Sequence, residues 1–464
     1  MIPKKPHLII FNPDSWRGDV VGHLGHPAAQ TPVLDHLVRE DAVSFRNAFV
    51  QNPVCTPSRC SFLTGWYPHT AGHRTMHHML RPHEPMLLRT LKQNGYYVFW
   101  AGKNDVVPAQ LGFSDYCDVK HFEESPHERN PHSWNEWRGD SEGDSYYSFY
   151  FGKLNCQVRK DVYFDGDQAN VSAAIEQIKN PPSEKPLCLY LPLGLPHPPY
   201  AAPEPWYSAI HRERVPPRVK PPLGWKGKPK ILKAISENNR LKNWDEVRWV
   251  ELRATYYAMC MRADSLLGQL IAALKEHGLY DQTAIFIFSD HGDFTGDYGL
   301  VEKTQNTFED CLTRTPFVIK PPRSTPVKPG IRDALVELID FPATVEALTG
   351  IPPRHTHFGR SLLPLIAGQT DQHRDAVFCE GGRNPGEQHA TEWNGDPAWL
   401  YAPRLSAEAR ESGEHGRACM LRTAGYKYVR RLYEQDELYD LERDPGEVHN
   451  CIDEPSHGSL LLEL

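Results

Sequence analysis

The sequence predicts a mixed α/β fold, in which a mostly parallel central sheet is flanked by helices and a smaller antiparallel sheet follows at the C-terminal end. Through most of the chain, short apolar runs alternate with longer segments of helical spacing. Polar residues follow several of the apolar runs directly. Past about residue 370, helical spacing gives way to short strand-like runs, which favours a small antiparallel sheet.

Four short apolar runs are predicted to be strands of the central sheet. They are residues 7–11, 96–101, 187–191 and 283–288, and turn-forming residues follow the first and the last of them. Because helical segments separate these runs, we expect the strands to pair in parallel and the helices to cover both faces of the sheet.

Segments of helical spacing are predicted at residues 31–49, 86–94, 168–179, 245–277 and 332–348. The first has Thr31 as its N-cap and Pro32 in its first turn. Strands are predicted again at residues 375–379, 419–431 and 437–441. We therefore expect two structural parts, residues 1–370 and residues 371–464.

Composition excludes several classes of protein. The chain has 464 residues, 40% hydrophobic and 24% charged, which is typical of a globular protein. The formal net charge of −8 provides no basic excess for binding nucleic acid. No apolar stretch approaches the ~20 residues that span a bilayer. The ten cysteines have no repeated spacing, which indicates buried thiols rather than a disulfide framework.

No targeting segment is visible at the start of the chain. The apolar run of residues 7–11 is too short for the core of a signal peptide, and Pro13-Asp14 ends it. We expect a cytoplasmic protein if Met1 is the native start, and otherwise an exported protein from which a leader has been removed.

Polar side chains that can bind a ligand follow the ends of the predicted strands. Ligands of open parallel sheets bind beyond the carboxyl ends of the strands, so these side chains are expected at one edge. Two carboxylates and one imidazole among them form a plausible site for a divalent metal ion. The residues are Asp14, Lys103, Asp105, His197, Asp290 and His291.

The segment Cys55-Thr56-Pro57-Ser58-Arg59 resembles the signature of the sulfatase family, and the resemblance continues through Gly65-Trp66-Tyr67-Pro68-His69. In that family a maturation enzyme oxidises the cysteine to formylglycine. The hydrated aldehyde has two hydroxyls on one carbon. One hydroxyl attacks sulfur, and the other later allows the carbon to return to the aldehyde and release sulfate. A serine has no second hydroxyl for this release. A helix that starts at this residue would add a favourable dipole.

The resemblance implies an alkaline-phosphatase-like fold, with residues 1–370 as the catalytic domain and residues 371–464 as a C-terminal subdomain. It also implies one divalent ion, with Ca²⁺ as the first expectation, bound by Asp14, residue 55, Asp290 and His291. Arg59 is expected to steady the formylglycine, and Lys103 to bind sulfate. His197 is expected to act as the general acid at the leaving oxygen, while Lys303 acts mainly through its charge.

Three positions depart from the pattern of many relatives. Ser15 replaces a second aspartate, His291 replaces an asparagine, and Asp105 replaces a histidine. These residues resemble the branch that contains phosphonate monoester hydrolases and some choline sulfatases. An imidazole in place of a carboxylate makes the site softer, so Mn²⁺ competes with Ca²⁺ as the expected ion.

Candidate substrate-binding residues are Asp105 and the segment that contains His73, Arg74 and His77. This segment follows the signature closely and either lines the substrate pocket or forms a solvated loop. Trp100, Trp206 and Tyr207 are expected to be packing residues rather than platforms for a sugar.

The predicted function is hydrolysis of a sulfate ester of a small molecule, either a sulfated carbohydrate or an aryl sulfate. The expected partners are this substrate and the formylglycine-generating enzyme. A phosphonate monoester or phosphodiester hydrolase that uses the same site is the main alternative. An unmodified, non-catalytic binding protein is more remote, as is a structural zinc protein, since paired cysteine spacing is absent.

Overall fold

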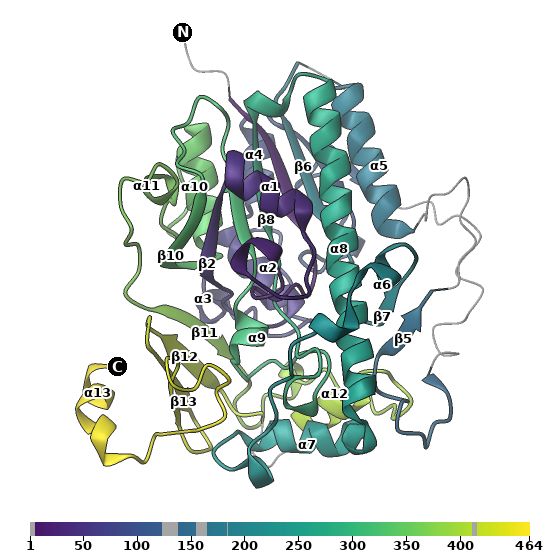
Figure 1. Ribbon diagram of the computed structural model, residues 1–464. Coiled ribbons are helices and arrows are strands. Elements are labelled where there is room, and N and C mark those ends of the chain that lie inside the picture. The colour runs from purple at the N-terminus through teal and green to yellow at the C-terminus, as the bar shows by residue number, and fades with distance from the viewer. Residues whose placement is uncertain (1–4, 123–137, 155–164, 183, 411–414) are drawn as a thin grey trace.

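A computed structural model describes residues 5–122, 138–154, 165–182, 184–410 and 415–464 (Figure 1). Its described residues form an eight-stranded sheet of order β10-β2-β9-β8-β1-β6-β3-β4. Only β9 runs antiparallel to its neighbours, so the predicted mostly parallel sheet is confirmed. The strands are β1 (His7–Asn12), β2 (Val43–Phe49), β3 (Tyr97–Ala101), β4 (Val119–His121), β6 (Leu187–Pro192), β8 (Thr283–Phe288), β9 (Phe317–Lys320) and β10 (Gly330–Glu337).

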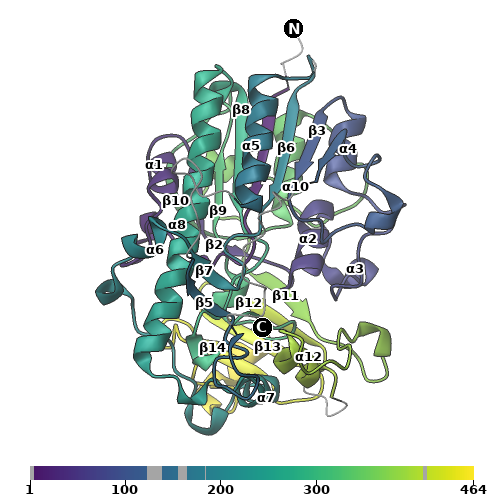
Figure 2. The same ribbon diagram turned by 90° about the vertical axis from the view of Figure 1, so that its right-hand side faces the viewer.

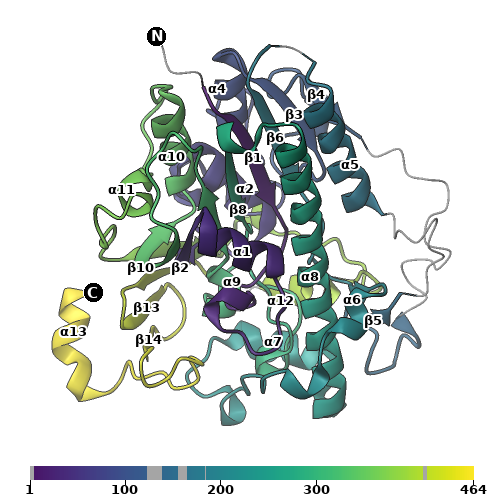
Figure 3. The same ribbon diagram turned by 45° about the horizontal axis from the view of Figure 1, so that its top comes forward.

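Helices cover both faces of this sheet (Figure 2 and Figure 3). Successive side chains of a strand point to opposite faces. On β1, Ile9 and Phe11 pack with one group of helices, and Leu8 and Ile10 pack with the other. The first group is α1 (Pro32–Glu40), α5 (Gly166–Lys179) and α8 (Glu246–Glu276); the second is α2 (Cys55–Thr64), α4 (Leu87–Gln93), α10 (Asp340–Thr349) and α11 (Leu363–Ile366).

The helix predicted for residues 31–49 is wrong in its second half. Helix α1 ends at Glu40, and strand β2 begins at Val43. The sequence between them contains no glycine or proline to mark the break. Strand β2 is stabilised by partners that are distant in the chain, because β10 pairs with it in parallel and β9 antiparallel. Tertiary pairing therefore overrides the local helical spacing.

The helix predicted for residues 332–348 is wrong for the same reason. Residues 330–337 form β10 at the edge of the sheet, and helix α10 starts only at Asp340. The Asp340 side chain accepts a hydrogen bond from the amide of Glu337 at 3.0 Å and thereby fixes the turn between strand and helix.

A second, four-stranded antiparallel sheet confirms the small antiparallel sheet that is predicted past residue 370. Its strands are β11 (Val377–Gly381), β12 (Ala418–Arg422), β13 (Tyr426–Arg431) and β14 (Glu437–Asp440). The single strand predicted for residues 419–431 is wrong, because Thr423 and Gly425 turn the chain there into two paired strands. The domain boundary at residue 370 stays a prediction.

The remaining described elements are short. Strand β5 (Tyr150–Lys153) pairs in parallel with β7 (Tyr200–Ala202). The other helices are α3 (Pro68–Ala71), α6 (Trp206–Ala209), α7 (Lys230–Asn239), α9 (Asp310–Thr313), α12 (Ala402–Glu408) and α13 (Gly458–Glu463). In the part of the chain that the structure describes, no helix is both long and apolar enough to span a membrane.

The nine described cysteines are all free thiols. Seven are buried, in agreement with the prediction, while Cys311 is partly buried and Cys419 is exposed. Cys156 lies outside the described residues.

Strand register brings the polar segments to one edge of the main sheet. Asn12 at the end of β1 lies opposite Pro192 at the end of β6. Hydrogen bonds then connect the segments beyond the strands: the Asp14 amide donates to the Leu195 carbonyl at 2.9 Å, and the Lys103 amide donates to the Pro192 carbonyl at 2.8 Å. The segments after β1, β3 and β6 therefore meet at this edge.

Candidate active site

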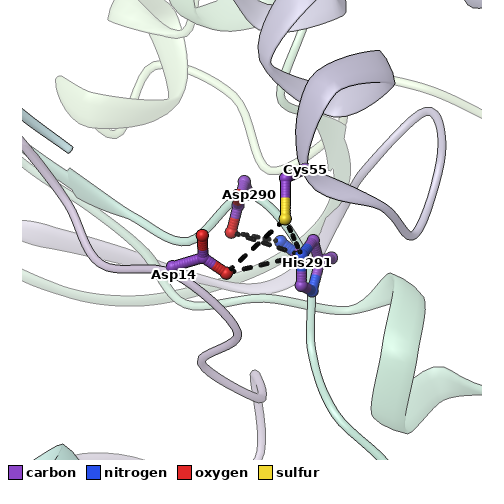
Figure 4. Close-up of side chains that lie close together, drawn as sticks. All are labelled: Asp14, Cys55, Asp290 and His291. Atoms are coloured by element: carbon purple, nitrogen blue, oxygen red, sulfur yellow. Dashed lines mark hydrogen bonds and ion pairs between the residues drawn. The ribbon is translucent and has the colours of Figure 1, made fainter. Parts of the chain in front are cut away.

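Four buried side chains meet beyond the carboxyl edge of the sheet. Asp14 follows β1, Cys55 is the first residue of α2, and Asp290 and His291 follow β8. One potential ligand atom from each lies within 4.8 Å of the corresponding atoms of the other three. Figure 4 shows the four side chains pointing toward one another. The predicted metal-binding set is therefore brought together.

The imidazole of His291 presents a free lone pair to this cluster. Its Nδ1 lies 2.8 Å from the Gly292 carbonyl oxygen, so Nδ1 is assigned as the protonated nitrogen that donates this bond. Its Nε2 lies 3.2 Å from Cys55 Sγ. Burial lowers the pKa of His291, and the neutral imidazole is the form that binds metal ions.

Each carboxylate, Asp14 and Asp290, turns one oxygen toward the Arg59 guanidinium and the other toward the cluster. Arg59, which is fully buried, donates from Nη2 to Asp14 Oδ2 and from Nε to Asp290 Oδ2, both at 2.9 Å. Oδ1 of Asp14 instead lies 3.5 Å from His291 Nε2, and Oδ1 of Asp290 lies 3.9 Å from it. Arg59 thus holds both carboxylates with one oxygen turned toward the cluster.

This donor set fits a divalent cation. Two carboxylate oxygens and one imidazole nitrogen, all buried, are ligands that Ca²⁺ and Mn²⁺ accept. Asp14, Asp290 and His291 would hold the ion beside residue 55. The Ser15 hydroxyl donates a hydrogen bond to Asp14 Oδ1 at 3.0 Å, so this residue places a neutral oxygen beside the cluster.

The segment before α2 and the end of that helix fix the position of Cys55. Asn52 accepts a hydrogen bond from the Val54 amide at 3.0 Å just before the helix. The helix ends at Gly65, whose φ of 73° is the left-handed conformation that glycine adopts readily. Arg59 lies one turn after Cys55, so the two side chains share a face of the helix. Burial, followed by the Asp14 carboxylate, raises the pKa of the Cys55 thiol.

Lys103 extends the cationic side of the site. Its Nζ lies 2.5 Å from Asp14 Oδ2 and 3.1 Å from Asp105 Oδ2. Burial alone would lower the pKa of Lys103, but Asp14 and Asp105 outweigh it and raise the pKa well above its usual value. Lys103 is therefore a fixed positive charge, and Asp105 holds its ammonium group from the other side.

His197 and Lys303 form a hydrogen-bonded pair. Lys303 Nζ lies 2.9 Å from His197 Nε2, and His197 Nδ1 lies 2.6 Å from the Pro198 carbonyl oxygen. Burial and then the Lys303 ammonium lower the pKa of His197 to about 3. In this geometry the imidazole is neutral and accepts at Nε2, so the proton of the pair resides on Lys303.

A buried ion-pair chain that the sequence did not reveal supports Lys303. Glu302 Oε1 lies 2.7 Å from Lys303 Nζ, and Glu302 Oε2 accepts from Arg404 Nε at 3.0 Å. Glu408 pairs with the same guanidinium at 3.2 Å. The dipeptide Glu302-Lys303 does not by itself indicate a buried ion pair, and Arg404 lies about a hundred residues further along the chain. Only the folded chain brings them together.

The histidine-rich segment after the signature makes no hydrogen bond or ion pair to the four clustered side chains among the described residues. His73 is buried and lies 2.7 Å from the His78 carbonyl oxygen and 3.1 Å from Glu84. Arg74 pairs with Glu387 at 3.0 Å. His77 is exposed. The role of these residues in binding substrate stays a prediction.

Comparisons with known proteins agree with this fold and site. The chain belongs to the sulfatase family, whose model matches residues 6–351. It is therefore a hydrolase of the alkaline-phosphatase-like superfamily, and that family implies a divalent metal ion and a formylglycine.

The named relatives share only about a quarter of their residues with this chain. Arylsulfatase K of Danio rerio is 25% identical over 479 residues, which cover 96% of this chain and 80% of that protein. An ulvan-active sulfatase of Formosa agariphila is 25% identical, covering 100% of this chain and 80% of that protein. The crystal structure of the phosphonate monoester hydrolase of Agrobacterium radiobacter superimposes with a TM-score of 0.75 at 21% identity, covering 99% of this chain and 94% of that chain.

Proposed function

We propose that this sulfatase cleaves a sulfate ester of a small molecule, with residue 55 as a formylglycine nucleophile. The supporting observation is the position of Cys55 Sγ, 3.2 Å from the metal-facing nitrogen of His291 and 3.9 Å from Asp14 Oδ1. Because burial raises the pKa of the thiol, an unmodified Cys55 would be a poor nucleophile. The oxidised residue removes that difficulty.

The cofactors of this proposal are Ca²⁺, with Mn²⁺ as the alternative, and the formylglycine made from Cys55 by a maturation enzyme. Asp14, Asp290 and His291 would hold the ion beside residue 55. When bound there, the ion would supply Lewis-acid polarisation of the ester and would favour the deprotonated form of a neighbouring hydroxyl. A formylglycine at position 55 would provide two hydroxyls on one carbon, one for attack and one for release of sulfate.

The cationic side chains stabilise the charge that develops on the sulfuryl group. Arg59 is neutralised by Asp14 and Asp290, so its main role is to orient them. Lys103, which is partly exposed, and Lys303, which is buried, are the cations proposed to bind the sulfuryl oxygens and to stabilise the transition state.

The His197–Lys303 pair protonates the leaving oxygen. Lys303 holds the proton in the resting protein, and His197 accepts its hydrogen bond. As negative charge grows on the ester oxygen, Lys303 donates its proton to that oxygen, while the neutral imidazole of His197 orients the ammonium group. His197 therefore contributes to general acid catalysis through its lysine partner.

A phosphonate monoester or phosphodiester hydrolase is the second candidate. The observation that favours it is the ligand set, in which His291 supplies an imidazole and Ser15, rather than a second carboxylate, follows Asp14. A site of this composition would also suit the singly charged tetrahedral group of a phosphonate monoester or a phosphodiester. An unmodified binding protein is the third and most remote candidate.

One experiment tests these candidates together. The mass of the purified peptide that contains Cys55 reports whether the thiol has become an aldehyde. Turnover of 4-nitrophenyl sulfate is then compared with that of a phenyl phosphonate ester, with the Cys55→Ala protein as control. Faster sulfate hydrolysis that disappears in Cys55→Ala supports the proposal. Faster phosphonate hydrolysis supports the second candidate, and an unmodified, inactive protein supports the third.

A further inference from the structure

Three aromatic rings that the chemistry above does not use lie together near the active site. The ring centroids of Tyr401 and Phe149 are 5.4 Å apart, and those of Tyr401 and Trp399 are 5.8 Å apart. Trp399 and Tyr401 precede helix α12, whereas Phe149 precedes strand β5. Tyr401 and Trp399 are only half-buried. Aromatic residues that form a cluster yet stay partly open to solvent suit contact with a ligand.

The cluster is connected to both members of the proton-donating pair. On one side, the Phe149 carbonyl accepts a hydrogen bond at 2.7 Å from the amide of Tyr200, three residues after His197. On the other side, the Arg404 guanidinium lies 5.7 Å from the centroid of the Tyr401 ring. Arg404 in turn holds Glu302, the partner of Lys303. The neighbours of the Tyr401 ring are therefore linked to both segments that carry the pair.

Tyr401 lies beside the chain of ion pairs that runs from Arg404 through Glu302 to Lys303. Burial raises the pKa of Tyr401 to about 12, and the other influences on it come from Lys303, Glu302, Lys103 and Cys55. Among the described residues the hydroxyl has no hydrogen-bond partner, whereas the hydroxyls of Tyr147 and Tyr200 each have one at 2.6 Å. It is therefore available to a bound molecule.

The segment that contains these aromatics is held in place. Arg138 Nη1 donates to the Ala398 carbonyl at 2.7 Å, and the Tyr147 hydroxyl donates to the Pro397 carbonyl at 2.6 Å. Phe149 has a φ of 56°, a left-handed conformation that is unfavourable for a bulky residue. A strained, fixed wall of this kind is typical of a binding site whose shape matters.

We infer that Tyr401, flanked by Phe149 and Trp399, is the platform on which the ring of the leaving group stacks. This inference rests on the proposed function and narrows its substrate to esters of an uncharged ring alcohol, either a pyranose or a phenol. The face of an aromatic ring packs against the flat apolar face of such rings, and the hydroxyl can bond a sugar hydroxyl.

A cationic leaving group such as choline fits this site poorly. Aromatic clusters do bind quaternary ammonium groups. Here, however, the Arg404 guanidinium already lies 5.7 Å from the centroid of the Tyr401 ring. A second cation at this ring would be repelled, whereas a neutral ring would not.

Kinetic comparison of three esters tests the inference. The esters are 4-nitrophenyl sulfate, a glucopyranose 6-sulfate and choline sulfate, which is acyclic and cationic. Tyr401→Ala is expected to lower kcat/KM for both ring esters about 10-fold, mainly by raising KM, and to change choline sulfate by less than about 2-fold. Tyr401→Phe is expected to preserve aryl turnover and to lower sugar turnover about 5-fold.

The matched control is Tyr433→Ala, which removes the same side chain at a position that is 41% exposed and follows β13. It should behave as wild type on all three esters. Equal losses on all three esters with Tyr401→Ala would assign the residue a structural role and overturn the inference. A loss confined to choline sulfate would also overturn it, because the cluster would then be a cation site.

A binding measurement separates this inference from the proposed function. In the Cys55→Ala protein, calorimetric titration with 4-nitrophenyl sulfate measures the ring contact without turnover. Adding Tyr401→Ala should weaken binding about 10-fold even if the native protein hydrolyses phosphonates rather than sulfates. Unchanged affinity, or no binding to either protein, overturns the inference whatever reaction the enzyme catalyses.

Discussion

Replacing Arg59 by methionine removes the cation that holds the two metal-binding carboxylates. Arg59, Asp14 and Asp290 all have fully buried side chains, and the guanidinium contacts one oxygen of each carboxylate. Methionine fills a similar volume but leaves Asp290 without its cationic partner and Asp14 with Lys103 alone. Breaking a buried pair on one side costs about 3–5 kcal/mol. We expect Arg59→Met to lower the free energy of unfolding by at least this amount in the absence of divalent ions.

A bound ion should offset part of this loss, since it brings positive charge to the same carboxylates. At about 100 times its dissociation constant, a ligand that binds only the folded protein adds about 2.7 kcal/mol. Urea unfolding followed by tryptophan fluorescence, with EDTA and then with Ca²⁺, measures both quantities. The stability gained from Ca²⁺ is expected to appear in the variant as well as in the wild type.

The control variant is Arg323→Met. Arg323 pairs with Asp281 at 2.9 Å, but the two side chains are 80% and 56% exposed. An exposed pair of this kind contributes about 0–1 kcal/mol. If Arg59→Met destabilises the protein no more than Arg323→Met does, the assigned role of Arg59 is incorrect.

Three further predictions concern the reaction itself. Lys103→Ala and His197→Ala are each expected to lower kcat/KM by at least about 10²-fold, and near-wild-type turnover in either variant would contradict its assigned role. Because burial and Lys303 lower the pKa of His197 to about 3, the imidazole should stay neutral throughout the neutral pH range, and Lys303→Met should raise its pKa toward 6.5. An ¹⁵N NMR titration measures this, and a wild-type His197 that titrates near 6.5 would refute the described pairing. EDTA should abolish turnover and lower the midpoint of thermal unfolding, and Ca²⁺ or Mn²⁺ should restore both; activity that survives exhaustive chelation would argue against a metal site.

The active-site cluster could be predicted from the sequence because its residues occupy positions that the fold brings together. Asp14 and Asp290 each follow an apolar strand, and parallel strands place such residues at one edge. Cys55 and Arg59 are four residues apart on a helix, which fixes their common face. Strand ends and helical spacing, both visible in the sequence, were therefore sufficient to predict that these four side chains lie together.

Two errors in the predicted elements have a common physical cause. Residues 43–49 follow helix α1, and residues 330–337 precede helix α10. No glycine or proline separates either segment from its helix, and the apolar residues of both have helical spacing. They form strands because they pair with each other across almost three hundred residues of chain. Such pairing has no local signal, so a single sequence does not reveal it.

The surroundings of the His197–Lys303 pair were not predictable for the same reason. Glu302 pairs with Lys303 and with Arg404 of helix α12, and Arg404 in turn lies 5.7 Å from the centroid of the Tyr401 ring. Three other aromatic residues are predicted from the sequence to be packing residues rather than sugar platforms: Trp100, Trp206 and Tyr207. Trp100 is fully buried, and the other two pack against the core. The aromatic cluster near the site comes from residues without any distinguishing motif.

The central claim is that residue 55 shares one divalent cation with Asp14, Asp290 and His291. A crystal structure of the native protein grown with Mn²⁺, with anomalous data collected at the manganese edge, tests it directly. The account predicts one strong peak bonded to these three side chains and next to an oxygen of a formylglycine at position 55. A strong peak elsewhere, with an unmodified thiol at Cys55 and no ion beside it, would contradict it.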